Sequence, residues 1–150
     1  MIKPNIWIID TSVFMNILDV EGFNQDRGII LKEFGSRIED KDIFFLPFVV
    51  LIETGNHIAQ LNGNIKFTKA QEFVKFVKSA LNGQTPFIPL RFPEKEDLLN
   101  WIDGFPEKAA QEIGFGDFSI IKDWEEQSNL SQGWSVKIWS LDAGLQGYAS

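Results

Sequence analysis

Cysteine is absent from this chain of 150 residues, and histidine and tyrosine occur only once each. The lack of thiols excludes disulfides and thiolate metal sites, and it is compatible with a reducing compartment. The single histidine, His57, argues against a zinc site rich in histidine and against a Ser-His-Asp triad made from several histidines. Carboxylates and hydroxyls are therefore the groups that remain for chemistry.

Basic residues are also scarce, because 14 Lys and Arg stand against 21 Asp and Glu, which gives a formal net charge of −7. Such a chain does not hold nucleic acid through a bulk positive potential, so any contact with nucleic acid has to be local. One way to bring a polyanion to an acidic protein is a cluster of carboxylates that divalent metal ions neutralise.

Long hydrophobic runs are missing as well. The apolar stretch at 6–9 is too short for the core of a signal peptide and far short of a membrane span, so we expect a cytoplasmic protein with no membrane association. The chain does contain 44% hydrophobic residues, including 14 Phe and 5 Trp. These residues suffice for one bulky aromatic core, and we expect a single domain over 1–150.

Apolar patterns along the chain alternate between short strands and amphipathic helices. Strands are predicted at 6–9, 43–46, 87–88 and 136–141, and the last one is expected near a sheet edge because it is less apolar than the first. Helices are predicted at 13–20, 25–38, 49–61, 68–81 with Thr68 as N-cap, 94–102, 106–113 and about 115–126. This order predicts an α/β fold, a three-layer sandwich in which helices flank a central, mostly parallel sheet of four to five strands.

Four carboxylates lie in otherwise apolar sequence. They are Asp10 directly after the first strand, Glu53 inside a helix, Asp117 at a helix start and Asp142 directly after the last strand. No Lys or Arg lies within two residues of any of them, and a carboxylate in such surroundings must be protonated, paired or bound to a cation. Mg²⁺ or Mn²⁺ would relieve repulsion among them, since these ions prefer oxygen ligands and assist phosphodiester cleavage.

Structural roles compete with this interpretation at each position. Asp10, Thr11 or Ser12 could simply cap the helix that follows the first strand. Asp117 also suits the positive end of a helix dipole, and Glu53 could be an ordinary surface residue. The case for chemistry depends on whether the fold brings the four acids together.

The ordered motifs of this chain resemble those of the PIN-domain family. The matching segments, spread from about residue 5 to the C-terminus, are Ile9-Asp10-Thr11-Ser12, Leu51-Ile52-Glu53, Gly116-Asp117-Phe118-Ser119-Ile120-Ile121 and Ser140-Leu141-Asp142. Ser140 stands where Thr is commoner in the family, and it keeps the hydroxyl.

The resemblance implies a PIN-like fold and a metal-dependent endoribonuclease. It implies catalytic and metal-binding roles for Asp10, Glu53, Asp117 and Asp142, with Mg²⁺ or Mn²⁺ as cofactor and RNA as substrate. It further implies the toxin of a bacterial toxin-antitoxin pair, with a cognate antitoxin as protein partner. Exposed aromatic surface would also make a homodimer reasonable.

Several polar residues near these motifs have two possible roles. Ser12, Asn16 and Ser140 are candidates to support the site by orienting a carboxylate or holding a water, with capping or turn roles as the alternative. His57 shares a helix face with Glu53, but a structural or surface role is expected. Asp123 is expected to be exposed to solvent. The lysines Lys66, Lys69, Lys75 and Lys78 are expected on the solvent-exposed faces of helices, with contacts to RNA phosphates as the alternative.

Two other functions compete with the ribonuclease. One is a PIN-like scaffold, catalytically weak or inactive, that binds RNA or a protein partner. The other is a phosphatase with an aspartyl nucleophile, which fits poorly because Ser12 stands where such enzymes need a second Asp.

Overall fold

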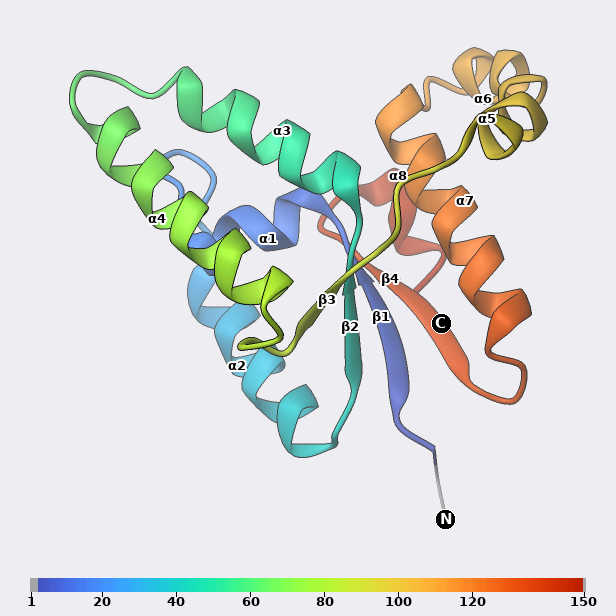
Figure 1. The fold of residues 1–150 in the computed structure, drawn as a ribbon, viewed down its shortest axis with the longest axis horizontal. Helices are drawn as coiled ribbons and strands as arrows, with labels where there is room; N and C mark the ends of the chain where they lie inside the picture. The colour runs from blue at the N-terminus through green and yellow to red at the C-terminus, as the bar shows by residue number, and fades with distance from the viewer. Residues whose placement is uncertain (1–2, 150) are drawn as a thin grey trace.

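Four parallel strands form one sheet in the computed structural model, which describes residues 3–149 (Figure 1). The strands are β1 (Asn5–Ile9), β2 (Ile43–Leu46), β3 (Phe87–Pro89) and β4 (Ser135–Trp139), in the spatial order β3-β2-β1-β4. Every neighbouring pair is parallel. The predicted α/β fold with four to five mostly parallel strands is confirmed.

Strand position in the sheet follows from composition. Ile8 and Ile9 of the central strand β1 are completely buried, as expected for a strand covered on both faces. The strand β3 lies at one edge, where Pro89 cannot disturb an inner hydrogen-bond ladder. The strand β4 forms the other edge, which confirms the prediction from its mixed sequence.

Eight helices surround the sheet in the described part of the chain. They are α1 (Thr11–Leu18), α2 (Arg27–Glu39), α3 (Phe48–Ala59), α4 (Ile65–Leu81), α5 (Lys95–Ile102), α6 (Phe105–Ala110), α7 (Phe115–Leu130) and α8 (Ala143–Gln146). Figure 1 shows α1, α2 and α4 on one side of the sheet and α7 on the other, which gives the three layers of the sandwich. No helix among residues 3–149 has the length and apolar character that a membrane crossing requires.

Aromatic side chains fill much of the core, as the composition predicts. Phe14, Phe44, Phe87 and Phe118 are each at most 2% exposed. The Phe34 ring of α2 stacks on Phe87 with ring centroids 5.2 Å apart, so it fastens this helix over the edge strand β3. Offset and edge-to-face pairs of this kind add to the free energy gained from apolar burial alone.

Two predicted boundaries are wrong in ways that matter for the site. The helix α4 begins at Ile65 with Asn64 as N-cap, so Thr68 lies inside the helix and does not cap it. The strand β4 ends at Trp139, two residues before the predicted end, and Asp142 is the N-cap of α8. The pattern missed α8 because four residues are too few to show a helical period.

Candidate functional site

The carboxyl ends of parallel strands meet at one edge of a sheet, and the candidate acids gather there. The register of β1 and β4 pairs Ile9 with Trp139, so the two residues that follow, Asp10 and Ser140, leave the sheet side by side. The Asp10 backbone N–H donates to the Trp139 carbonyl at 3.0 Å, which extends the ladder by one bond. A crevice outside the carboxyl ends of strands is the usual ligand site of open α/β sheets.

Asp10 is 4% exposed, and its carboxylate is held by two hydroxyls. Its Oδ2 accepts hydrogen bonds from Ser12 Oγ at 2.9 Å and from Ser140 Oγ at 2.6 Å. Although Asp10 occupies the N-cap position of α1, its side chain makes no capping hydrogen bond. The capping alternative therefore does not account for this side chain.

Ser12 and Ser140 also join the start of α1 to the turn after β4. The Leu141 N–H donates to Ser12 Oγ at 2.9 Å, and the Asp142 N–H donates to Ser140 Oγ at 2.9 Å. Each hydroxyl thus donates to the carboxylate of Asp10 while it accepts from the backbone of the last turn. The predicted orienting role of both serines agrees with these contacts.

Glu53 reaches the same region from α3. Its Oε1 accepts a hydrogen bond from Thr11 Oγ1 at 2.6 Å. The sequence indicates for Thr11 only a possible capping role and does not reveal that it is a partner of Glu53. The signal available was a hydroxyl directly after Asp10, but its partner lies 42 residues away and is visible only in the fold.

The start of α7 packs closely against Glu53. A Cβ atom at Gly116 would lie 3.0 Å from Glu53 Oε2, a contact that real Cβ atoms rarely make. The glycine therefore allows the first turn of α7, which carries Asp117, to approach the carboxylate on α3. This contact is a second feature of the site that sequence reasoning did not identify.

The raised pKa of Asp117 indicates that the four acids lie close enough to interact. Burial raises the pKa of Asp117 to about 7, with further increases from a hydrogen bond to Asp142 and from the negative charges of Asp10, Asp142 and Glu53. None of the contributing groups is basic. Carboxylates from four separate segments thus share one region in which negative charge is not compensated.

Asp142 closes the cluster from the exposed side. Its Oδ1 accepts a hydrogen bond from the Gly144 N–H at 2.9 Å, which caps α8. The predicted position directly after a strand is wrong, because Ser140 and Leu141 intervene. The side chain nevertheless lies within hydrogen-bond reach of Asp117.

A divalent cation fits this donor set in charge and chemistry, since carboxylate oxygens are the preferred ligands of Mg²⁺ and Mn²⁺. The side-chain positions fit less well. Over residues 3–149 no three Asp, Glu, His or Cys side chains are arranged so that they could hold one metal ion. Binding would therefore require the carboxylates to move toward a common point.

Asn16 does not reach the acids. Its Nδ2 donates to the Ser12 carbonyl at 2.9 Å and its Oδ1 accepts from the Asp26 N–H at 3.0 Å, while only 2% of the residue is exposed. It therefore ties α1 to the loop before α2 and supports the site only through the backbone of Ser12. His57 packs on Phe23 with ring centroids 4.5 Å apart, which is a structural contact.

Two charged residues expected on solvated helix faces are buried to a large extent. Lys69 is 6% exposed, pairs with Glu72 at 2.7 Å and donates to the Leu18 carbonyl at 3.4 Å, because α4 packs against the end of α1. Asp123 is half-buried, and burial raises its pKa to about 7, with an added increase from Glu126 and an opposing effect of Arg91. The predictions for these two residues are wrong.

Neither family models, curated proteins nor solved structures gave a match to this chain. The functional argument therefore stands on the geometry of the acidic cluster, which we define as Asp10, Glu53, Asp117 and Asp142. Thr11, Ser12 and Ser140 hold two of its members in place.

Proposed function

We propose that this protein is a PIN-like endoribonuclease that depends on Mg²⁺ or Mn²⁺ and acts through the acidic cluster. The observation that supports this proposal is the raised pKa of Asp117, which burial and three other carboxylates keep near 7. Like charges gathered at the carboxyl edge of a sheet destabilise the fold unless a cation is present during function. Such a cluster is therefore expected to serve a purpose other than stability.

Hydrogen bonds prepare two of the carboxylates for this role. Asp10 uses Oδ2 for both of its hydroxyl contacts, and Glu53 uses Oε1 for Thr11. Their other oxygens have no hydrogen-bond partner among residues 3–149. Hydroxyls that fix one oxygen of a carboxylate orient the second one toward a ligand, as supporting partners do in metal sites.

The acidic cluster would hold the cation, and the ion when bound supplies positive charge for the scissile phosphate and for the leaving oxygen. Before a cation binds, the Asp117 carboxyl has a raised pKa of about 7. A bound cation would lower this pKa, so Asp117 would then serve as a charged ligand. Ser12 and Ser140 keep the Asp10 carboxylate in position.

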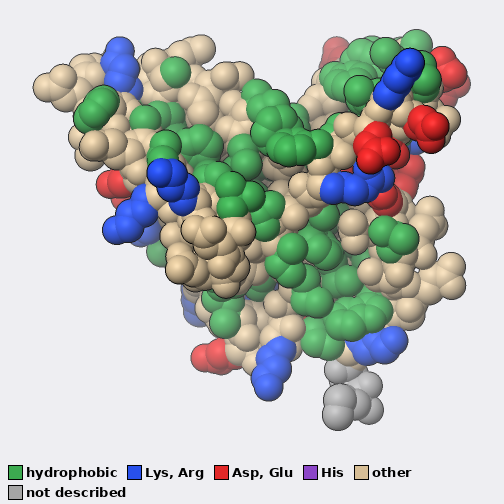
Figure 2. Space-filling model, in the orientation of Figure 1, with side chains coloured by type: hydrophobic (Ala, Val, Ile, Leu, Met, Phe, Trp, Pro, Cys, Tyr) green, Lys and Arg blue, Asp and Glu red, His purple; other side chains and the backbone are tan. Residues whose placement is uncertain are grey.

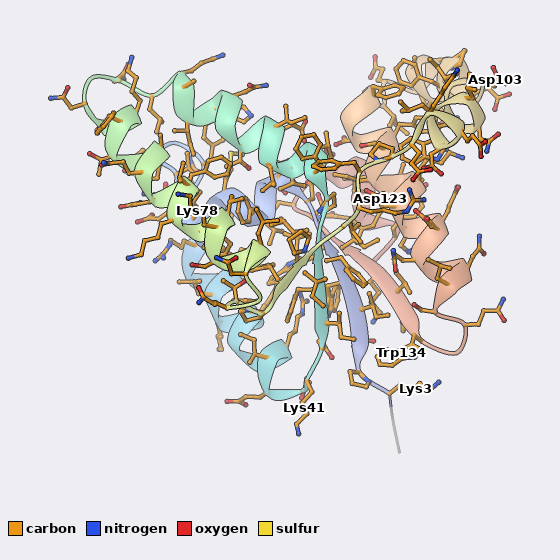
Figure 3. The ribbon with its side chains drawn as sticks, viewed as in Figure 1. Lys3, Lys41, Lys78, Asp103, Asp123 and Trp134 are labelled. Carbon is orange, nitrogen blue, oxygen red and sulfur yellow. The ribbon has the colours of Figure 1, made fainter. Side chains whose placement is uncertain are left out.

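Cleavage of RNA by an Asp10→Asn variant tests the proposal. The amide keeps the size of the side chain but removes one negative charge, so we expect Mn²⁺-dependent cleavage of single-stranded RNA to fall by about 100-fold or more. Asp103→Asn is the matched control, because Asp103 is exposed on the α5–α6 segment (Figure 3) and makes none of the contacts described for the cluster. The control should cleave RNA like the unaltered protein.

Undiminished cleavage by a folded Asp10→Asn variant would contradict the proposal. An unaltered protein that binds RNA without cleaving it would favour the alternative of an inactive PIN-like scaffold. Membership of a toxin-antitoxin pair, an antitoxin partner, a homodimer and a cytoplasmic location remain predictions of the sequence.

A further inference from the structure

A cavity of about 180 Å³ lies beside the acidic cluster, between α3, α5 and α7. Figure 2 shows the surface hollowed between α3 and the α5–α6 segment. The side chains that matter for the argument are Phe48 and Ile52 of α3, Trp101 of α5, and Phe115, Ser119 and Asp123 of α7. Drug-sized ligand sites measure about 300–1,000 Å³, so this cavity suits a single flat ring system.

The cavity and the acidic cluster share the helices α3 and α7. Phe115 and Ser119 lie two residues on either side of Asp117, so they occupy the opposite face of α7 from Asp117. The cavity approaches the cluster instead at Gly116, where Glu53 Oε2 lies 3.0 Å from the position of a Cβ atom. Val49 also lines the cavity, and its Cγ2 lies 3.5 Å from where a Cβ of Gly116 would be. The wall that Val49 forms therefore lies close to the Glu53 carboxylate of the acidic cluster.

The walls combine aromatic faces with one unused polar group. Phe48, Trp101 and Phe115 supply the aromatic surface. Asp123 lies between α7 and the segment that leads from β3 to α5 (Figure 3), and its carboxyl makes no hydrogen bond among residues 3–149. Aromatic faces and an unsatisfied hydrogen-bonding group are the features with which proteins recognise unstacked bases.

Arg91, the neighbouring basic residue, makes no hydrogen bond to Asp123. Arg91 also lines the cavity, but it donates to Asp97 at 2.9 Å and to Glu126 at 2.8 Å. Glu126 raises and Arg91 lowers the pKa of Asp123, while burial dominates and brings it to about 7. The carboxyl can therefore accept or donate hydrogen bonds to a ligand at neutral pH.

We propose that this cavity binds one unpaired nucleobase of the RNA strand, next to the phosphate at the acidic cluster. Trp101 provides the stacking surface, Phe48, which packs edge-to-face on Phe92, adds apolar contact, and Asp123 reads the hydrogen-bonding edge of the base. The proposal rests on the proposed ribonuclease function and specifies its substrate as single-stranded RNA with a base that can leave the stack. It also explains how an acidic protein holds RNA without a basic surface, because stacking supplies binding that is independent of charge.

Fluorescence anisotropy with a labelled single-stranded RNA tests the proposal, in an Asp10→Asn background that prevents turnover. Loss of base stacking in Trp101→Ala should weaken binding by about 5- to 100-fold. Trp101→Phe keeps an aromatic face and should retain most of the affinity. Phe67→Ala is the control, because Phe67 is 68% exposed on α4 and lines no part of this cavity.

Two further measurements separate base recognition from a purely structural effect. Asp123→Asn should change the relative affinities for oligo-A, oligo-C and oligo-U, since an amide offers a fixed donor and acceptor, whereas a loss of packing would weaken all three equally. The same strand in a duplex should bind more weakly, because its bases are stacked and paired. Melting temperatures of the variants show whether each remains folded.

The outcomes distinguish this proposal from the proposed function. If the unaltered protein cleaves RNA but Trp101→Ala and Asp123→Asn bind RNA like Phe67→Ala, the nucleobase site is refuted and the ribonuclease stands. Equal binding of duplex and single strand also refutes the nucleobase site. If the unaltered protein neither binds nor cleaves RNA, both proposals fail.

Discussion

Three hydroxyls, from Thr11, Ser12 and Ser140, make all the side-chain contacts described above to the carboxylates of Asp10 and Glu53. A neutral donor satisfies a carboxylate oxygen without cancelling its charge. The folded protein therefore keeps the repulsion among the acids, which adds to the larger effect of burial in raising the pKa of Asp117. Basic partners in the same positions would stabilise the fold but would leave no excess negative charge for a cation.

Stability should fall as the pH rises toward neutrality. Burial is the largest cause that raises the pKa of Asp117, and also that of Asp123, from 3.8 to about 7. Between about pH 4 and pH 7 the folded chain binds more protons than the unfolded chain, so each group contributes stability that is lost as the pH increases through this range. The slope is at most about 1.4 kcal/mol per pH unit for each group.

Melting curves between about pH 5 and pH 8, recorded without divalent ions, measure this effect. Asp117→Asn should flatten the decline and raise the melting temperature at the upper end, because the amide has no proton to lose. Asp103→Asn should keep the full decline. The same slope in Asp117→Asn and in the unaltered protein would show that Asp117 does not titrate as described.

Single residues differ in how far the sequence reveals them. Asp10 and its serine partners could be predicted because a buried strand that stops at an acid and a hydroxyl is a local signal. Thr11 could not, because its hydrogen bond depends on where α3 lies. Asp123 and Lys69 were assigned to solvent from helical spacing, which locates the apolar face of a helix but does not reveal which neighbours cover the polar face.

At the scale of whole elements, the approach of α7 to α3 decides the shape of the site. Gly116 lies in the first turn of α7, and the nearest atom to its missing Cβ is Glu53 Oε2. In most helices a glycine destabilises the helix by about 1 kcal/mol relative to alanine. Here it lets two helices bring their carboxylates together.

Gly116→Ala should therefore reduce activity while it leaves the stability of the protein almost unchanged. The new methyl group gains helix propensity but displaces Glu53, so we expect RNA cleavage to fall by about 10- to 100-fold with little change in melting temperature. Steady-state cleavage and thermal melting of the same sample measure both effects.

Gly35→Ala provides the control for this substitution. Gly35 lies inside α2, and a Cβ there would meet no atom within 4 Å. It should stabilise the protein by about 0.5–1 kcal/mol and leave cleavage unchanged. Equal activity of the two alanine variants would contradict the positioning role of Gly116.

The order of the elements could be predicted well, and their relative placement less so. Strands and long helices have periodic patterns, which is why β2 was predicted at its observed bounds. The register that sets Asp10 beside Ser140 depends on the pairing of β1 with β4, and no local pattern encodes a contact between residues so far apart in sequence. The short helix α8 was missed, and with it the turn that presents Asp142.

For the molecule as a whole, the acidic cluster should couple metal binding to stability. A ligand that binds only the folded chain stabilises it by about 2.7 kcal/mol at 100 times its Kd. Mn²⁺ should therefore raise the melting temperature in a concentration-dependent manner, with Asp103→Asn as a variant that keeps the response.

Asp10→Asn should lose most of this increase, since one of the carboxylates loses its charge. Sodium chloride at matched ionic strength controls for general screening of the net charge of −7. A melting temperature that Mn²⁺ leaves unchanged, in a protein that still cleaves RNA, would exclude the acidic cluster as the metal site.

The contacts between α1 and the turn after β4 have a consequence for biosynthesis. Ser140 donates to Asp10 across 130 residues of sequence, and Asp142 follows two residues later. A nascent chain that has not yet released β4 from the ribosome lacks both groups and leaves Asp10 short of a partner. If the acidic cluster cleaves RNA as proposed, the growing polypeptide stays inert toward RNA until β4 and the turn that follows it have been synthesised and have folded against α1.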